Sequence, residues 1–251
     1  MLASNTEWKR WGEKDPLWAA GVWHGRQRDG PNPWTDTDFY AAGRLDWAEF
    51  RSRWERYGLN YESCVEVGSG AGRITAPLVH DFKIVHGVDV SPAMLDYAKS
   101  RVPAARLFVT DGVHIPIDDS SVTAAFSSQV LQCLDSLADA IPIFSELHRV
   151  LRPGSSMMIH LPIYTCPWGA FLYRRLFAVW QWGARQRARV YRRLGLPLMR
   201  YTWYEAGWLR GILQKRGFQD IEFITFSASA GYLHSFVLAR KASGTSQSLA
   251  K

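Results

Sequence analysis

Residues Val65–Arg73 read VEVGSGAGR, a short apolar run followed by glycines at alternate positions. The run predicts a buried strand, and Ala71–His80 beyond it predicts a helix. Glycine lets such a turn approach a ligand closely, and the helix start presents free backbone N–H groups. A dinucleotide-binding fingerprint needs its third glycine at the position of Arg73, and no Gly-Lys-Ser/Thr of a phosphate-binding loop follows. On its own, the motif fits a tight turn as well as a ligand cradle.

Acidic residues end the next two predicted strands. Asp89 closes a strand over 83–90, and Asp111 follows a strand over 106–110, with Gly112 directly after it. Open α/β sheets bind ligands at the carboxyl ends of neighbouring parallel strands. A carboxylate at Asp89 can accept both hydrogen bonds of a ribose diol. The alternatives are that Asp89 only caps the next helix and that Asp111 is a solvated loop acid.

Predicted strands and helices alternate through the middle of the chain. This alternation is typical of a doubly wound α/β fold, in which helices cover both faces of a mostly parallel sheet. We expect strands at 63–67, 83–90, 106–110, 122–128, 156–161, 221–226 and 232–239. We expect helices at 45–57, 71–80, 92–101, 137–151 and 205–216.

Five segments between Cys64 and Leu161 resemble class I S-adenosylmethionine-dependent methyltransferases, and within them the group called type 11. They are VEVGSGAGRIT (65–75), GVDVSPAMLDYA (87–98), TDGVHIPIDDSSV (110–122), FSSQVLQCL (126–134) and LHRVLRPG (147–154). The resemblance covers about two-fifths of the chain. It implies a Rossmann-like sheet of seven strands whose last strand is antiparallel. A helical N-terminal extension and a helical insertion after the fifth strand would be added to it.

The resemblance also implies S-adenosylmethionine as the cofactor and assigns residues to it. Glu66 and the three glycines would cradle its methionine and ribose, and Asp89 would hold the ribose hydroxyls. Val90 and Met94 would flank the adenine. Asp111 would accept from the adenine N6 amine, and Gly112 would let the ring approach. The full implied set is Glu66, Gly68, Ser69, Gly70, Gly72, Asp89, Val90, Met94, Asp111, Gly112 and Ser128.

Methyl transfer is an in-line displacement at a sulfonium, so the protein mainly positions the acceptor and excludes water. A base is needed only where the acceptor loses a proton on attack. Where the family often has histidine after the fourth strand, this chain has Gln132-Cys133. His160 and Tyr164, at the end of the fifth strand, are the remaining candidates for a catalytic role. The alternative is that both side chains only pack.

Tryptophan separates the flanks from the middle, since none lies between Trp54 and Trp168. We expect a Trp-rich cap or lid at 1–60, a cofactor-binding core at 61–163 and a basic aromatic helical insertion at 164–202. The core would resume at 203–241, and 242–251 would be a flexible tail. In the first flank, Arg44 is placed to pair with the methionine carboxylate of the cofactor. The alternative is that the tryptophans merely pack helices onto the sheet.

The positive charge is local, because eight arginines and no acidic residue lie between Tyr164 and Tyr204, against a net charge of +7 for the chain. The Arg174–Arg200 segment could contact an anionic membrane, bind an acidic substrate or form a solvated cationic face. The chain adds no RNA-binding module, which weakens a nucleic-acid partner.

Three scattered cysteines predict neither disulfides nor a metal site, and the charged N-terminus does not resemble a signal peptide, so we expect a cytoplasmic protein. The predicted function is methyl transfer to O, N or C of a small, apolar or aromatic acceptor, with a lipid or quinone as the membrane-proximal case. The alternatives are an inactive cofactor-binding partner subunit and an RNA methyltransferase.

Overall fold

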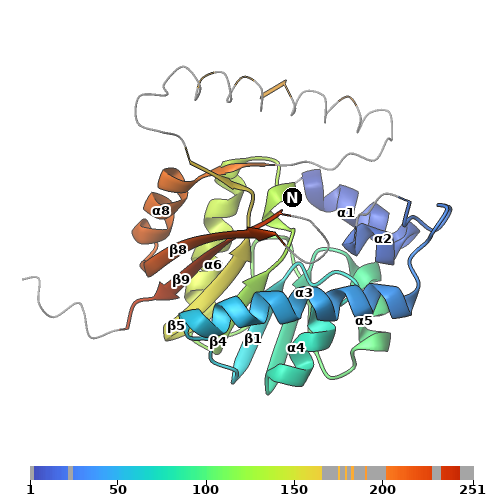
Figure 1. The fold of residues 1–251 in the computed structure, drawn as a ribbon, viewed down its shortest axis with the longest axis horizontal. Helices are drawn as coiled ribbons and strands as arrows, with labels where there is room; N and C mark the ends of the chain where they lie inside the picture. Colours follow the sequence, from blue (N-terminus) through green and yellow to red (C-terminus); the bar gives the residue numbers. More distant parts are fainter. Residues whose placement is uncertain are drawn as a thin grey trace, which may run out of the picture.

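The computed structural model describes residues 3–21, 25–165, 175, 179, 182–183, 190, 202–227 and 233–243. A seven-stranded sheet in the order β3-β2-β1-β4-β5-β9-β8 forms its centre (Figure 1). The strands are β1 (Ser63–Val67), β2 (Ile84–Asp89), β3 (Arg106–Val109), β4 (Val122–Ser127), β5 (Leu151–His160), β8 (Phe218–Ser227) and β9 (Leu233–Lys241). β1 to β5 pair in parallel, and β9 is antiparallel to both β5 and β8. The prediction of a doubly wound, mostly parallel seven-stranded fold is therefore confirmed.

Helices cover both faces of the sheet. They are α1 (Ala3–Lys14), α2 (Pro16–Ala20), α3 (Asp36–Tyr57), α4 (Thr75–Asp81), α5 (Pro92–Arg101), α6 (Ala140–Val150) and α8 (Ala206–Lys215), with 3-10 turns η1 (Leu131–Cys133) and η2 (Leu137–Asp139). Along β5, Met157 and Ile159 pack with residues of α6 and α8, whereas Met158 packs with residues of α3 and α4. Successive strand residues point to opposite faces, so the apolar run of β5 serves two cores.

The N-terminal flank is more helical than the sequence predicted. α3 begins at Asp36, nine residues before the expected start, where the Thr35 hydroxyl accepts a hydrogen bond from the Asp38 backbone N–H. This capping signal lies outside the apolar periodicity on which the prediction rested. Conversely, α4 begins only at Thr75, because residues 71–74 form turns after the glycines. β5 starts at Leu151 and runs through Pro153-Gly154, which we expected to precede the strand.

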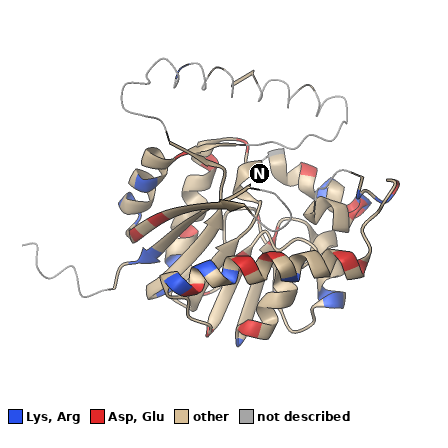
Figure 2. Ribbon diagram, in the orientation of Figure 1, with Lys and Arg blue, Asp and Glu red and all other residues tan. Residues whose placement is uncertain are grey.

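Charged side chains of both signs lie along α3 (Figure 2). Asp36 pairs with Arg101 of α5, Asp46 pairs with Arg73 and Arg51 pairs with Asp81 of α4. On the inner side of α3, Trp54 is buried and donates its indole N–H to the Ser156 hydroxyl at 2.9 Å. α3 is thus fixed to the sheet by apolar packing and to two helices by ion pairs.

Several predictions concern residues that the structure leaves undescribed. Most of the proposed 164–202 insertion, including seven of the eight arginines of the Arg174–Arg200 segment, lies outside the described residues, as do 228–232 and the tail from 244. At the two ends of the insertion, β6 (Ile163–Tyr164) and β7 (Tyr204–Glu205) pair in parallel as a separate two-stranded sheet. Within the part of the chain that is described, no helix has the length and apolar character needed to cross a bilayer.

The crossing of α3 over the glycine turn depends on Gly43. A Cβ at this position would lie 2.0 Å from the carbonyl oxygen of Arg73, which is backbone and cannot move aside cheaply. We expect Gly43→Ala to lower the free energy of unfolding by about 1–3 kcal/mol, the usual cost of overpacking. Urea denaturation measures this change. Gly211→Ala in α8 is the matched control, since a Cβ there meets nothing within 4 Å, and it should stabilise by up to about 1 kcal/mol. Equal effects of the two substitutions would contradict the close crossing.

Candidate functional site

The glycine turn joins β1 to α4 in a conformation that side chains resist. Gly68, Gly70 and Gly72 have φ angles of 76°, 53° and 85°, in the left-handed region that glycine adopts without strain. The backbone N–H groups of Gly68 and Ser69 donate to the Val88 carbonyl at 2.8 and 3.1 Å, which ties the turn to β2. A Cβ at Gly68 would lie 2.1 Å from Cγ2 of Val130. The three glycines therefore allow a tight backbone turn at the edge where β1 ends.

Asp89 lies at the end of β2, beside this turn. One carboxylate oxygen accepts from the Gly70 N–H at 2.9 Å and the other accepts from the Ser91 N–H at 2.8 Å. Burial raises the pKa of Asp89, and the backbone hydrogen bonds oppose that rise. A carboxylate has about four acceptor positions, and the backbone of Val90 also hydrogen-bonds to it, so Asp89 retains acceptor capacity for a ligand beside three backbone donors. The structure brings Asp89 and the glycines together.

A cavity lies over these strand ends. Its walls come from both the sheet edge and the first two helices. The lining residues include Ser4, Asn5, Trp8, Ala19, Ala20, Glu66, Gly68, Ser69, Gly70, Arg73, Asp89, Val90, Met94, Gly112, Val113, Ile115, Ser128, Gln129, Val130, Cys133, Leu134 and Ile143. The mixture of apolar walls with a few polar groups suits a small-molecule ligand.

Three of these residues present buried hydroxyl groups without a partner. The Oγ atoms of Ser4, Ser69 and Ser128 are buried and make no hydrogen bond to any part of the chain that the structure describes. A buried hydroxyl costs free energy when it is unpaired, so such groups are expected where a ligand or water supplies the missing bond. Together with Asp89 and the glycine turn, they fit a polar ligand with hydroxyl, amino and carboxylate groups.

Glu66 is buried on β1 and accepts a hydrogen bond from the Thr75 hydroxyl at 2.6 Å. Desolvation by burial raises the pKa of Glu66 to about 8, against partial lowering by Thr75 and Arg73. Its carboxyl is consequently largely protonated near pH 7 in the ligand-free protein. A neutral Glu66 can donate as well as accept a hydrogen bond beside the cavity.

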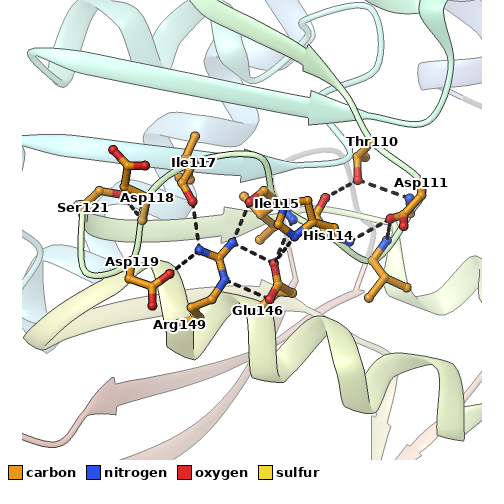
Figure 3. A network of polar contacts seen from close by, with 12 residues as sticks. Thr110, Asp111, His114, Ile115, Ile117, Asp118, Asp119, Ser121, Glu146 and Arg149 are labelled. Carbon is orange, nitrogen blue, oxygen red and sulfur yellow. Dashed lines mark hydrogen bonds and ion pairs between the residues drawn. The ribbon is translucent and has the colours of Figure 1, made fainter.

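The loop after β3 is held by α6, as Figure 3 shows. Arg149 donates to the carbonyls of Ile115 and Ile117 at 2.7 and 2.9 Å, and Glu146 accepts from the Ile115 N–H at 3.0 Å. Hydrogen bonding to Arg149 keeps the pKa of Glu146 below its ordinary value. Gly112 and Val113, which line the cavity, are therefore carried on a braced loop.

Asp111 does not line the cavity, contrary to the expected contact with the adenine amine. Its side chain is exposed, and Oδ1 accepts from the N–H groups of Val113 and His114, both at 2.8 Å. These backbone bonds lower the pKa of Asp111. The carboxylate closes its own loop instead of pointing into the cavity. Gly112 does line the cavity, but the group packed over it is the Asn5 amide of α1.

Arg44 is likewise displaced from its expected position. It lies on the exposed side of α3 and is absent from the lining residues, whereas Arg73 is buried and lines the cavity. Arg73 forms an ion pair with Asp46. Successive residues of a helix point in different directions, so Arg44 does not share the direction of Gly43, which faces the glycine turn.

His160 and Tyr164 lie outside the described lining as well. His160 is buried on the α3 side of β5, with Nε2 3.4 Å from Nδ1 of His234 and its ring 5.1 Å from that of Phe236. Burial lowers the pKa of His160 to about 3. Tyr164 is half-buried in β6, paired with Glu205 of β7. Their surroundings match the packing alternative rather than the catalytic one.

The remaining predicted residues line the cavity, apart from Gly72, whose Cβ would instead approach Ala98 of α5 at 3.2 Å. Sequence reasoning missed Ser4, Asn5 and Trp8, because no motif marks α1. Gln129, Val130 and Cys133 were also missed, although they lie within the segment 126–134 that carries the resemblance. Gln129 has a φ of 61°, a conformation that nothing in its sequence announces.

The strand order, the antiparallel β9 and the cavity above the glycine turn define the class I methyltransferase fold, whose methyl donor is S-adenosylmethionine. The chain contains a methyltransferase domain, since residues 65–159 match the family model described as "Methyltransferase domain".

Three comparisons extend this finding. An uncharacterized methyltransferase of Mycobacterium tuberculosis is 37% identical over 93 residues, which is 37% of each protein. A demethylmenaquinone methyltransferase of Tropheryma whipplei is 25% identical over 180 residues, covering 69% of this chain and 73% of that protein. The solved structure of the [4+2]-cyclase SpnF superposes with a TM-score of 0.61 at 15% identity over 97% of each chain. The chain spans little more than a third of the M. tuberculosis relative, and the likeness to SpnF concerns the fold alone.

The raised pKa of Glu66 makes the stability of the ligand-free protein depend on pH. The unfolded carboxyl ionises near 4.5 and the folded one near 8, so folding free energy is lost as pH rises between these values. Glu66→Gln keeps the shape and cannot ionise. We expect the variant to gain about 2 kcal/mol relative to the native protein between pH 5.5 and 7.5. Urea denaturation at both values measures the gain, and parallel pH profiles would contradict a protonated Glu66.

Proposed function

We propose that this chain is an S-adenosylmethionine-dependent methyltransferase that methylates O, N or C of a small, apolar or aromatic organic acceptor. The observation that carries the proposal is the hydrogen bond between Asp89, at the carboxyl end of β2, and the left-handed glycine turn that follows β1. This arrangement suits an adenosine ligand, because the carboxylate can accept from a ribose diol while the turn leaves room for the rest of the molecule.

The lining residues divide by chemistry among the parts of the cofactor. Asp89 would hold the ribose hydroxyls, and Val90 and Met94 would contact the adenine faces. Near the glycine turn, Arg73 offers a buried cation for the carboxylate of the methionine portion, in place of Arg44. The unpartnered Ser128 hydroxyl offers a further hydrogen bond to a polar group.

The cofactor would supply an electrophilic methyl group on its sulfonium. The work left to this chain is to hold the donor, orient the acceptor and keep water out. α1 and α2 contribute Trp8, Ala19 and Ala20 to the walls, so the N-terminal segment covers part of the cavity. This supports our proposal that residues 1–60 act as a cap.

Two observations support the acceptor class. Apolar side chains dominate the cavity beyond the glycine turn, among them Ile115, Val130, Leu134 and Ile143. The T. whipplei relative carries the name of an enzyme that acts on demethylmenaquinone, an acceptor with a quinone ring. A quinone-like or lipid acceptor is the narrower form of the proposal.

A quinone-like or lipid acceptor would lie in a membrane, so we also propose that the Arg174–Arg200 segment contacts an anionic membrane surface. If the segment binds such a surface, changing Arg185, Arg187, Arg189 and Arg192 to Gln should reduce flotation with vesicles that contain phosphatidylserine. Equal flotation of both proteins would remove membrane contact and leave the methyl-transfer proposal standing.

Cofactor binding is tested by calorimetry with S-adenosylmethionine and S-adenosylhomocysteine. Asp89→Ala should weaken both by about 100-fold, the value of two hydrogen bonds to a charged group. Asp96→Ala is the control, because Asp96 is exposed on α5 and should leave affinity unchanged. Incubation of a metabolite extract with a labelled methyl donor then identifies the acceptor. A folded protein that binds neither compound, or whose Asp89→Ala variant binds equally well, would refute the proposal.

A further inference from the structure

We propose that Asn5, on the N-terminal helix α1, reads the amino edge of the adenine, the contact that family resemblance assigns to Asp111. The inference rests on the proposed function, since it takes the cavity to hold an adenosine ligand. It makes Asn5 a specificity-determining residue of the cofactor site.

The orientation of the Asn5 amide is fixed by its partner. Nδ2 donates to the backbone carbonyl oxygen of Asp111 at 2.6 Å. A carbonyl only accepts, so the nitrogen of the amide must face it and Oδ1 must face elsewhere. None of the described residues donates a hydrogen bond to Oδ1. Asn5 is 5% exposed and lines the cavity, so this side chain holds an acceptor without a protein donor at a buried ligand site.

Neither polar group of Asp111 competes for the same role. Its Oδ1 accepts from two backbone N–H groups, its side chain is exposed, and it is not among the lining residues. Its main-chain carbonyl is occupied by Asn5 itself. At this point of the cavity wall, the side chain that presents a hydrogen-bond acceptor is therefore that of Asn5 on α1, not that of Asp111.

Gly112 provides the space for this arrangement. A Cβ at Gly112 would lie 2.6 Å from Nδ2 and 3.0 Å from Oδ1 of Asn5, and its φ is 93°. Any other residue would push the amide away from the loop. Val90, Met94 and Val113 line the same cavity and supply apolar surface suited to an adenine ring.

Contacts at both ends hold α1 in position. At its start, the Ser4 backbone N–H donates to Oδ2 of Asp135 at 3.1 Å. Further along, Gly12 crosses α5 so closely that a Cβ would lie 2.3 Å from Oγ of Ser91. Asn5 is thus carried on a helix that is fixed to the loop after β4 and to the start of α5.

Base selectivity follows from the fixed amide. The exocyclic amine of adenine can donate to Oδ1, whereas hypoxanthine has a carbonyl at that position and would place two acceptors together. Turning the amide to suit hypoxanthine would set Oδ1 against the Asp111 carbonyl instead. The native protein should therefore prefer the adenosine ligand by about 10-fold or more, the value of one lost hydrogen bond and one unpaired buried acceptor.

The test compares the affinities of S-adenosylhomocysteine and S-inosylhomocysteine by calorimetry. Asn5→Ala should reduce the preference of the native protein to about threefold or less. Asp111→Asn retains the side-chain oxygen that closes the loop and should keep the full preference. Thr6→Ala, which changes an exposed neighbour of Asn5 on α1, should also keep it. Circular dichroism and thermal unfolding show whether each variant retains the native fold.

The outcomes separate this inference from the proposed function. If the native protein binds S-adenosylhomocysteine but does not distinguish the two compounds, the role of Asn5 is overturned and the cofactor site stands. Full preference in Asn5→Ala, or its loss in Asp111→Asn, also overturns it. If Asn5→Ala disturbs α1, Asn5→Ser supplies a second, smaller polar variant, and retention of full preference there refutes the proposal. Failure of the native protein to bind either compound would refute both proposals together.

Discussion

The carboxylate of Asp89 joins the elements on which the site depends. Its two oxygens accept from Gly70 in the turn after β1 and from Ser91 at the start of α5. The turn in turn donates to Val88, one residue before Asp89. Three neighbouring pieces of backbone are therefore fixed to one another at a single buried charge, and the cost of burying that charge is met by N–H groups that point at it. The same carboxylate lines the cavity, where it retains acceptor capacity for a ligand.

A second set of contacts joins α6 to the loop after β3, which also lines the cavity. Arg149 and Glu146 of α6 bind the backbone of the loop after β3, and they also contact the side chains of Asp119 and His114 in that loop (Figure 3). Such contacts fix the course of the loop while leaving its lining residues free to vary. Because the loop carries Gly112, and Gly112 admits the Asn5 amide, these contacts also set the place where α1 can rest. The cavity is consequently formed by the Asp89 cluster, the loop after β3 and the helix α1.

The sequence predicted well those features that depend on local pattern. The strands of the parallel sheet, the glycine turn and Asp89 follow from apolar runs and turn residues within a few positions of one another. The structure places Arg44, Asp111 and His160 outside the cavity lining, because their positions depend on which way a helix or strand turns its side chains once it is packed. His160 follows Ile159 on β5, and alternation along the strand sends it to the α3 face, among Phe236 and His234. The sequence alone does not show whether His160 faces α3 or the cavity, because the answer depends on where α3 packs.

The N-terminal helix was the least predictable part of the site and has the largest consequence for it. α1 contributes Ser4, Asn5 and Trp8 to the cavity, although more than fifty residues separate it from the glycine turn. Its position is set by contacts with Asp135, Ser91 and the Asp111 carbonyl, each on a different segment of the core. A ligand that fills the cavity lies against α1 as well as against the sheet edge, so occupancy of the site is coupled to the position of the first helix. The same coupling explains why a short polar side chain on α1 can complete a site whose other groups come from the sheet.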